Sequence, residues 1–365
     1  MDRDTSVRTP QVARRQVLLA LGSLLYACSR AQQGTPVPAS SSSTASSGAS
    51  AAQPSASGAP SPGQSACSIA SGAVSSAPNP TPKPTASHFE RPTGPDDVSV
   101  STIFLDPSQG GPHWIRLLRP SWGAGAGFPL LVALHGLGEA QKGREPGSWG
   151  WIRDYHLDRA MVRIRQGELT SADFQGFVDP KRLSRINRSL RKRPFRGVVV
   201  ACPYTPDLIT ERSLDNAGPF GTFLIERVLP RIRQESDILS TPASTGLDGV
   251  SLGGRLALLV GFARTQQLGA VGTMQTAIDN GEVHELARRA SAAAHAASFR
   301  LRLLTSDKDF YREPVQALHQ ALSASGVNHD FLMIPGPHAY AFNRGPGAIE
   351  MLLWHDRVLR GEDPV

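Results

Sequence analysis

The sequence predicts an α/β fold, in which a mostly parallel central sheet carries helices on both faces. Short apolar runs alternate with segments of helical periodicity through most of the chain after residue 96, as is typical of repeated strand–helix units. Within this alternation Gly249, Ser251 and Gly253 form a G-x-S-x-G pattern directly before an apolar helix-forming segment. A sharp strand-to-helix turn is expected there, which fits the same kind of sheet.

Strands are expected where apolar residues form continuous runs or alternate with polar ones, and helices where apolar residues recur every three or four positions. The expected strands cover 98–105, 113–118, 128–134, 197–201, 244–249, 269–274, 299–305 and 331–334. The expected helices cover 223–234, 254–264, 282–297, 313–324 and 348–360. A Gly-rich break between the first two strands predicts that they form a hairpin. The segment 244–248 is more polar than a central strand usually is.

Composition limits the function classes. Hydrophobic residues make up 40% of the 365 residues, enough for a large core, and the net charge is +7. Nucleic-acid binding is not expected, because no basic face with interleaved aromatic residues is present. The chain has no C-x-x-C and no H-E-x-x-H, so no structural zinc or zincin-type metal site is expected. Cys67 and Cys202 either pair in an oxidising compartment or remain free thiols.

Residues 1–28 have the features of an export signal. A twin arginine at 14–15 precedes a short apolar run and small residues, which resembles a twin-arginine signal. Residues 25–28 read Leu-Tyr-Ala-Cys and resemble the lipobox of bacterial lipoproteins, in which Cys28 is acylated and becomes the mature N-terminus. The alternative is an ordinary signal peptide cleaved close to the same place. Both interpretations place the protein outside the cytoplasm, lipid-anchored in the cell envelope or secreted.

The rest of the chain divides by composition. Residues 29–95 are mostly Ser, Ala, Pro, Gly and Thr, so they are expected to form a disordered tether. The tether would connect the lipid anchor at the membrane surface to the folded domain at 96–365. Within that domain, 139–196 departs from the strand–helix alternation and is longer than a simple crossover needs. It is either a cap over the carboxyl edge of the sheet or an ordinary crossover with a surface excursion.

A catalytic constellation can be placed on this framework. Ser251 is the candidate nucleophile and needs a base that takes its proton. His338 is the best candidate for the base, because its loop follows the last strand and reaches the carboxyl edge of the sheet, where the serine turn also ends. The acid that orients the imidazole is expected after an intervening strand. Asp309 is favoured, Asp307 is the alternative and Asp279 a third choice; the unused neighbour of the acid is expected to be a turn residue.

A tetrahedral intermediate would also need two backbone donors for its oxyanion. The first expected donor is the amide of Leu252, which follows the serine. The second is expected from the glycine-rich loop 134–139, at Leu137 or Gly136. His135, in the same loop, is expected to be a structural hydrogen-bonding residue rather than a base.

Four short segments match a known family: 134–138, 249–254, 309–311, and 336–338 followed by an aromatic residue. With them, 98–360 resembles an α/β-hydrolase, and more narrowly the esterase group of feruloyl-esterase-like, esterase-D-like and antigen-85-like proteins. The order of serine, aspartate and histidine along the chain is that of α/β-hydrolases. The resemblance implies hydrolysis of carboxylic esters through an acyl-serine intermediate, with no cofactor.

Two other functions stay open at this point. A serine peptidase or another acyl hydrolase of the same fold would use the same residues. A non-catalytic surface lipoprotein would keep the fold for binding. The expected partner is a small-molecule or polymer-borne ester, and the sequence does not give the oligomeric state.

Overall fold

The computed structural model describes residues 98–106, 112–123, 125 and 127–365. The export signal predicted over 1–28 with its lipidation site Cys28, the tether predicted over 29–95 and the pairing of Cys67 fall outside these residues and stay predictions. Within the described ranges, no helix is long and apolar enough to cross a membrane.

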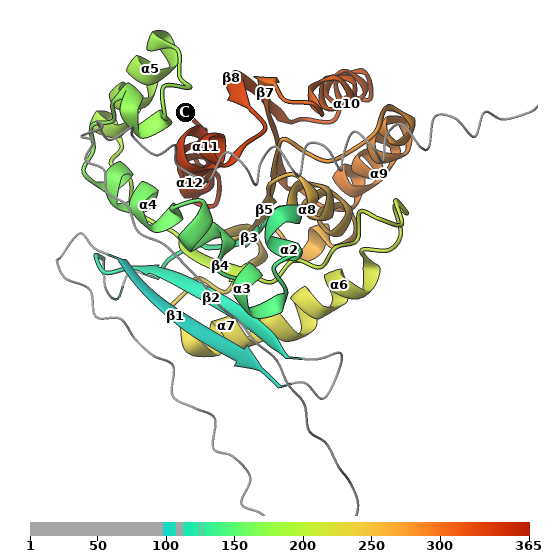
Figure 1. Cartoon of the computed structure of the whole chain (residues 1–365), viewed down its shortest axis with the longest axis horizontal. Coiled ribbons are helices and arrows are strands. Elements are labelled where there is room, and N and C mark those ends of the chain that lie inside the picture. Colours follow the sequence, from blue (N-terminus) through green and yellow to red (C-terminus); the bar gives the residue numbers. More distant parts are fainter. Residues whose placement is uncertain (1–97, 107–111, 124, 126) are drawn as a thin grey trace, which may run out of the picture. The chain divides into compact units, whose positions relative to one another are not determined.

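An eight-stranded sheet runs through the folded part of the chain (Figure 1), in the order β1-β2-β4-β3-β5-β6-β7-β8. The strands are β1 Val98–Leu105, β2 His113–Pro120, β3 Leu130–Leu134, β4 Val199–Pro203, β5 Thr245–Gly249, β6 Ala270–Met274, β7 Arg300–Lys308 and β8 Asp330–Pro337. β2 pairs antiparallel with β1 and with β4, whereas the remaining pairs are parallel. The predicted fold class and its opening hairpin are confirmed.

Helices cover both faces of the sheet, because successive side chains of a strand point to opposite faces. Along β3, Leu130 and Val132 lie in a core shared with α6 to α10, and Leu131 and Ala133 lie in a core shared with α4, α5 and α12. The helices are α2 Leu137–Ala140, α3 Arg144–Gly147, α4 Leu157–Arg165, α5 Pro180–Lys192, α6 Gly218–Phe223, α7 Leu229–Glu235, α8 Leu252–Ala263, α9 Val283–Ala296, α10 Arg312–Ala324, α11 Tyr340–Phe342 and α12 Ala348–Val358. Burial on both faces explains why β3 is apolar throughout.

Residues 139–196 form the crossover between β3 and β4. Trp151, Met161 and Ile186 of this segment are fully buried, in the core that also contains the inner face of α12. This packing is the one expected of an ordinary crossover that covers a sheet face. A further role of the segment as a cap stays a prediction.

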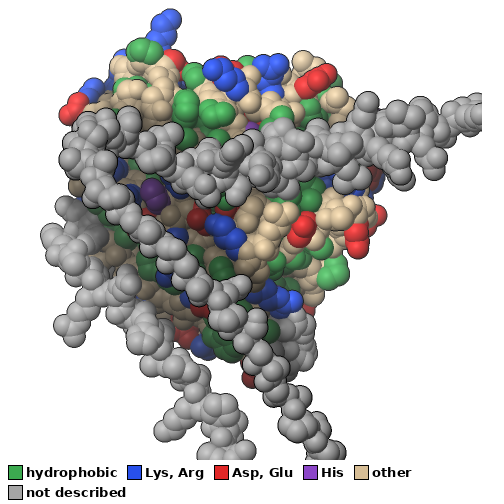
Figure 2. Space-filling model, viewed as in Figure 1, with side chains coloured by type: hydrophobic (Ala, Val, Ile, Leu, Met, Phe, Trp, Pro, Cys, Tyr) green, Lys and Arg blue, Asp and Glu red, His purple; other side chains and the backbone are tan. Residues whose placement is uncertain are grey.

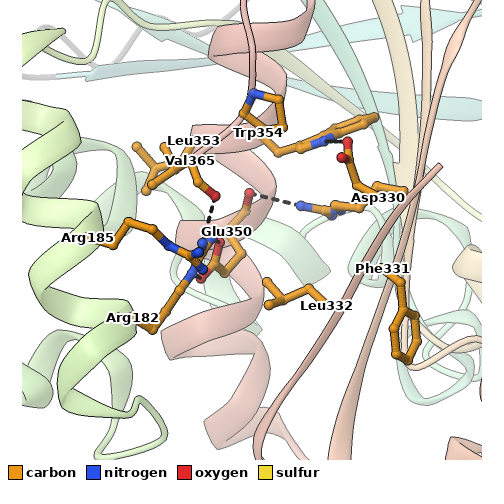
Figure 3. A pocket seen from close by; sticks show the side chains of 11 residues that line it. Arg182, Arg185, Asp330, Phe331, Leu332, Glu350, Leu353, Trp354 and Val365 are labelled. Carbon is orange, nitrogen blue, oxygen red and sulfur yellow. Dashed lines mark hydrogen bonds and ion pairs between the residues drawn. The ribbon is translucent and has the colours of Figure 1, made fainter. Parts of the chain in front are cut away.

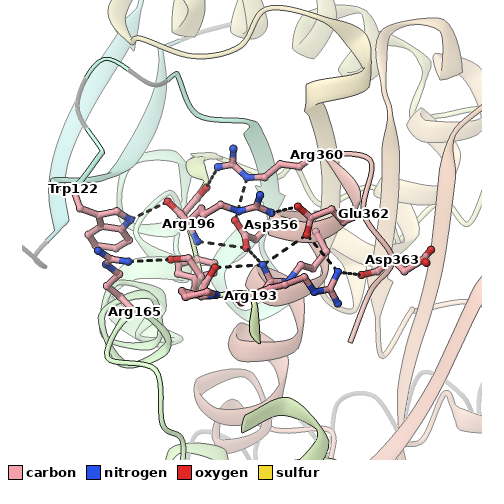
Figure 4. A network of polar contacts seen from close by, with 12 residues as sticks. Trp122, Arg165, Arg193, Arg196, Asp356, Arg360, Glu362 and Asp363 are labelled. Atoms are coloured by element: carbon pink, nitrogen blue, oxygen red, sulfur yellow. Dashed lines mark hydrogen bonds and ion pairs between the residues drawn. The ribbon is translucent and has the colours of Figure 1, made fainter. Parts of the chain in front are cut away.

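Ion pairs attach the end of this crossover to α12. Arg182 of α5 is buried and pairs with Glu350, at the wall of a cavity of about 220 Å³ between α5, β8 and α12 (Figure 3). Further along, Arg196 bonds Glu362 at 2.7 Å, and Arg357 bonds both Asp356 and the carbonyl of Arg193 (Figure 4). These contacts hold the crossover against α12 and the residues that follow it.

Most cations of α5 are exposed rather than paired in this way. Lys181, Arg185 and Arg188 are exposed on the helix. Figure 2 shows Lys and Arg side chains along the upper edge of the face seen in Figure 1, with acidic side chains also on that face. The basic stretch of the sequence therefore forms a solvated helix face.

The polarity of β5 has a specific cause. Asp248 is fully buried, and its Oδ2 accepts hydrogen bonds from Arg302 of β7 and His355 of α12, both at 2.9 Å. Gly272 makes room for this carboxylate, since a Cβ there would lie 2.0 Å from Oδ2. A buried charge is tolerated when it is paired and hydrogen-bonded in this way. β5 is therefore a central strand despite its polar sequence.

Candidate active site

Ser251 lies at the turn between β5 and α8. Its φ is +55°, in the left-handed region that residues with a side chain seldom adopt. Backbone hydrogen bonds to the segment after β6 hold it there. The Ser251 N–H donates to the Met274 carbonyl at 3.0 Å, and the Ser251 carbonyl accepts from the Ala277 N–H at 3.1 Å. Such a conformation costs on the order of 1–3 kcal/mol and persists where surrounding contacts enforce it, typically at functional sites.

The two glycines of the pattern are required by close approach of the backbone. A Cβ at Gly249 would lie 2.3 Å from the backbone of Gly253, and a Cβ at Gly253 would lie 2.3 Å from the carbonyl oxygen of Leu134. Backbone atoms cannot move aside as a flexible side chain can. The turn is therefore packed directly against the end of β3, where the loop 134–139 begins.

His338 and Asp309 are hydrogen-bonded to each other, and each follows a parallel strand. His338 Nδ1 and Asp309 Oδ1 are 2.8 Å apart. The carboxylate is buried and also accepts from the Thr305 hydroxyl at 2.8 Å and the Tyr311 N–H at 3.0 Å. The imidazole itself is 15% exposed. Asp309 is thus held in place beside Nδ1, and Nε2 of the ring is left for another partner.

Asp307, the alternative acid, has a different partner. Its Oδ1 accepts from the Gly336 N–H at 2.8 Å, at the register shift between β7 and β8. The expectation of a turn residue is wrong, because β7 continues through Asp307 and gives it a neighbouring strand to bond. Asp279, the third choice, pairs with Arg212 and caps a short helical turn. Of the three aspartates, only Asp309 contacts His338.

Gln275 connects the serine turn to the loop that carries His338. It follows β6, has a φ of +46°, and its Nε2 donates to the Pro337 carbonyl at 2.9 Å and to the Ser306 hydroxyl at 2.7 Å. In the part of the chain that the structure describes, the Ser251 hydroxyl and the His338 ring are not hydrogen-bonded to each other. Such bonds are often long without substrate and tighten in the reactive complex.

The candidate oxyanion donors lie at two helix starts beside the serine. Leu252 opens α8 and Leu137 opens α2, so neither N–H has an acceptor within its own helix. The Gly136 N–H instead donates to the Tyr155 hydroxyl at 3.3 Å. A Cβ at Gly136 would lie 3.9 Å from Cβ of Ser251, so this loop borders the serine. Among the described residues, neither the Leu252 N–H nor the Leu137 N–H has a backbone acceptor, so both are available to a ligand.

His135 shapes the same loop as a neutral ring. Its Nε2 accepts from the Thr205 N–H at 2.9 Å, so Nδ1 carries the proton and donates to the Gly136 carbonyl at 3.0 Å. Complete burial lowers the pKa of His135 to about 4. A ring with both nitrogens engaged is a structural hydrogen-bonding group rather than a base.

Besides Gln275, four residues of the site were not singled out from the sequence. Glu139 is buried behind the oxyanion loop and bonds Tyr155 and Tyr340, which are 16 and 201 residues away in the chain. Phe310 covers one side of the His338 ring, with 4.1 Å between the ring centroids, and is 47% exposed. The available signals were weak: Glu139 directly follows Gly138 of the motif, and Tyr340 is the aromatic residue after His338.

Metal-ligating clusters and reactive thiols are two other groups that could carry chemistry. No group of three or more His, Cys, Asp or Glu side chains there could hold a metal ion. Cys202 is a free cysteine buried in β4, and burial raises the pKa of its thiol, which disfavours the reactive thiolate.

Comparison with known proteins bears on the fold. No family model matches the chain, and no curated protein matches it. Solved structures do: a ferulic acid esterase is 15% identical, with 72% of this chain and 99% of that chain covered and a TM-score of 0.53. An S-formylglutathione hydrolase of Staphylococcus aureus is 12% identical, with 73% and 100% covered and a TM-score of 0.53. A fluorophosphonate-binding serine hydrolase of the same organism is 11% identical, with 72% and 99% covered and a TM-score of 0.52.

The class that fold and site define is the α/β-hydrolase fold, with a serine at the strained turn after the central strand β5. The similar structures named above are an esterase, an S-formylglutathione hydrolase and a serine hydrolase. The resemblance inferred from the sequence is thereby confirmed at the level of the fold.

Proposed function

We propose that this protein is a serine esterase that hydrolyses carboxylic esters through an acyl-serine intermediate. The observation that carries the proposal is the 2.8 Å bond between His338 Nδ1 and the buried Asp309 carboxylate, in a fold that presents Ser251 at a strained turn. The ferulic acid esterase and the S-formylglutathione hydrolase among the similar structures support a hydrolase of this reaction class.

In the proposed mechanism Asp309 keeps the proton of the imidazole on Nδ1, so Nε2 has a lone pair for the serine proton. The Ser251 oxygen attacks the ester carbonyl as His338 takes its proton. The amides of Leu252 and Leu137 donate to the resulting oxyanion. The C–O bond to the alcohol then breaks, and the alcohol leaves with the proton from His338. Water, activated by the same histidine, releases the acid and restores Ser251.

We further propose that the enzyme works outside the cytoplasm, on an ester that is either free or attached to a polymer. The export signal predicted over 1–28 supports this location, and Cys28 would supply the lipid anchor. Mass spectrometry of the mature N-terminus tests it. An acylated Cys28 is the expected result. An N-terminus that still begins at Met1, in cells that export proteins, would contradict it.

The reaction is tested with p-nitrophenyl acetate and the Ser251→Ala variant. Wild type should turn over the ester, and the variant should lose at least about a thousandfold in kcat, because the nucleophile is gone. Ser184→Ala, at an exposed serine on α5, is the matched control and should keep wild-type kcat. Undiminished turnover in Ser251→Ala would overturn the proposal. Turnover of a matched p-nitroanilide in preference to the ester would instead indicate a peptidase.

A further inference from the structure

A buried carboxylate lies where the loop 134–139, the candidate oxyanion loop, meets the loop after β8 that carries His338. Glu139 belongs to α2, is the last residue of the loop 134–139, and is 1% exposed. Its Oε2 accepts from the Tyr155 hydroxyl, and its Oε1 accepts from the Tyr340 hydroxyl at 2.5 Å. Lys142, itself partly exposed, places its Nζ 3.7 Å from Oε1. The proposed reaction gives this carboxylate no direct role.

One arm of Glu139 reaches the oxyanion loop. Tyr155, which donates to the carboxylate, also accepts from the Gly136 N–H at 3.3 Å. A Cβ at Gly136 would lie 3.1 Å from the tyrosine hydroxyl and 3.4 Å from Oε2 of Glu139. The carboxylate and the tyrosine therefore set the turn that leaves the next amide, that of Leu137, free for the oxyanion.

The other arm reaches the loop that carries the candidate base. Tyr340 opens α11, two residues after His338. A Cβ at Gly138 would lie 2.8 Å from the Tyr340 hydroxyl, so the two loops are in direct contact at this point. Through its two oxygens, a single side chain thus binds the segment with the oxyanion donor and the segment with the base.

The cost of this arrangement argues for a role beyond stability. Burial raises the pKa of Glu139, and the hydrogen bonds from the two tyrosines oppose that rise. Burying a carboxylate is unfavourable even when it is hydrogen-bonded, and an apolar side chain of similar volume is often as stable or more so. Gly150 leaves space for it, because a Cβ there would lie 2.5 Å from Cγ of Glu139.

We propose that Glu139 is a positioning residue, which through Tyr155 and Tyr340 holds the oxyanion loop and the His338 loop at a fixed mutual distance. It touches neither substrate nor reacting atoms. The inference rests on the proposed esterase function for its kinetic consequences, while the structural coupling of the two loops does not depend on it.

Kinetics of Glu139→Ala, Tyr340→Phe and the double variant test the catalytic part. A misplacement of about 1 Å can cost about a hundredfold in rate, so kcat of Glu139→Ala should fall about a hundredfold with KM nearly unchanged. Tyr340→Phe should lose less, and the double variant no more than Glu139→Ala alone, because both remove the same link. Glu139→Gln keeps one acceptor oxygen and should recover part of the loss. Unchanged kcat in Glu139→Ala, or additive losses in the double variant, would overturn the proposal.

Hydrogen exchange tests the coupling without any substrate. In Glu139→Ala, the hydrogen-bonded amides of the two loops should lose protection together, namely those of Gly136, Ala140, Gln141, Ala339 and Phe342. The control is Glu350→Gln, which changes a glutamate of similar burial in α12 that lies outside the site and should leave both loops protected. Loss of protection in one loop only, or in neither, would overturn the coupling. An inactive wild type would overturn the proposed function separately and leave this measurement decisive for Glu139.

Discussion

Two buried aspartates of this molecule each hold a histidine at nearly the same distance, 2.8 Å for Asp309–His338 and 2.9 Å for Asp248–His355. The first aspartate binds Nδ1 of a ring that is 15% exposed. The second binds Nε2 of a ring that is fully buried, and it shares the same oxygen with Arg302. Distance alone therefore does not distinguish the proposed catalytic pair from a structural pair.

The difference lies in what each ring can still do. Nδ1 of His355 has no hydrogen-bond partner among the described residues and lies against the backbone of β5, since a Cβ at Gly246 would be 2.6 Å from it. His338 follows β8 and Ser251 follows β5, so both lie at the carboxyl edge of the sheet, and the aspartate engages Nδ1 rather than Nε2 of the ring. A base needs a nitrogen that a substrate complex can reach, and only the pair at the sheet edge offers one.

The largest expected effect separates the two aspartates by activity. In Asp309→Asn the amide NH₂ would face Nδ1 and favour the ring tautomer with its proton on Nε2, which cannot accept the serine proton. By analogy with other serine hydrolases, kcat should fall about ten-thousandfold. Steady-state kinetics on p-nitrophenyl acetate, with the folded fraction measured by circular dichroism, gives the result. A loss below tenfold would end the distinction between the two pairs.

Asp248→Asn should show the opposite behaviour. Removing one partner of a buried ion pair leaves the other charge unpaired, so the free energy of unfolding should fall by about 3–5 kcal/mol. The folded fraction should keep its kcat, because this cluster lies behind the serine turn between β5, β7 and α12. Urea denaturation and kinetics of the same preparation measure both quantities. Retained stability combined with a large loss of kcat would reverse the assignment of roles.

The pH dependence of stability should reflect the buried rings. Burial lowers the pKa of His135 to about 4 and lowers that of His355. The folded protein then binds fewer protons than the unfolded chain, so the stability from these rings is complete above pH 6.5 and is lost as pH falls. For His135 the loss from pH 6.5 to 4 amounts to about 3 kcal/mol.

Urea denaturation at pH 7, 6, 5 and 4 measures this loss. His355→Asn should start from a lower stability at pH 7 and then fall less steeply than wild type. If the free energy of unfolding fell equally steeply with pH in the two proteins, His355 would not contribute to the loss of stability at low pH.

The smallest effect is expected at Asp307. Asp307→Asn keeps an oxygen that can accept from the Gly336 N–H, and the residue is exposed, so stability should change by less than about 0.5 kcal/mol. kcat should stay near wild type, because His338 keeps its bond to Asp309. Steady-state kinetics compare kcat of Asp307→Asn with kcat of Asp309→Asn. A loss of kcat in Asp307→Asn as large as that in Asp309→Asn would make Asp307 the acid.

Local sequence patterns predicted the fold because each strand and helix carries its own periodicity. The features that could not be predicted depend on contacts between residues far apart in the sequence. The choice between Asp309 and Asp307 depends on where β7 ends, and the chain continues as a strand through Asp307 because β8 pairs with it past a register shift. No local pattern near residue 305 encodes that partner.

The same limit applies to the polar side chains. The polarity of β5 looked unsuited to a central strand, because its compensation comes from Arg302 and His355, 54 and 107 residues further along the chain. The contacts of Glu139 with Tyr155 and Tyr340 likewise join separate segments. A motif can indicate the reacting residues, but the groups that hold them in place are visible only in three dimensions.

The most direct test of the central claim is to map the adduct of a fluorophosphonate probe by mass spectrometry. The account predicts a single adduct on the peptide that contains Ser251 in wild type, and at least about a hundredfold slower labelling in His338→Ala, because the serine then lacks its base. No adduct, or one on another residue, would contradict the account.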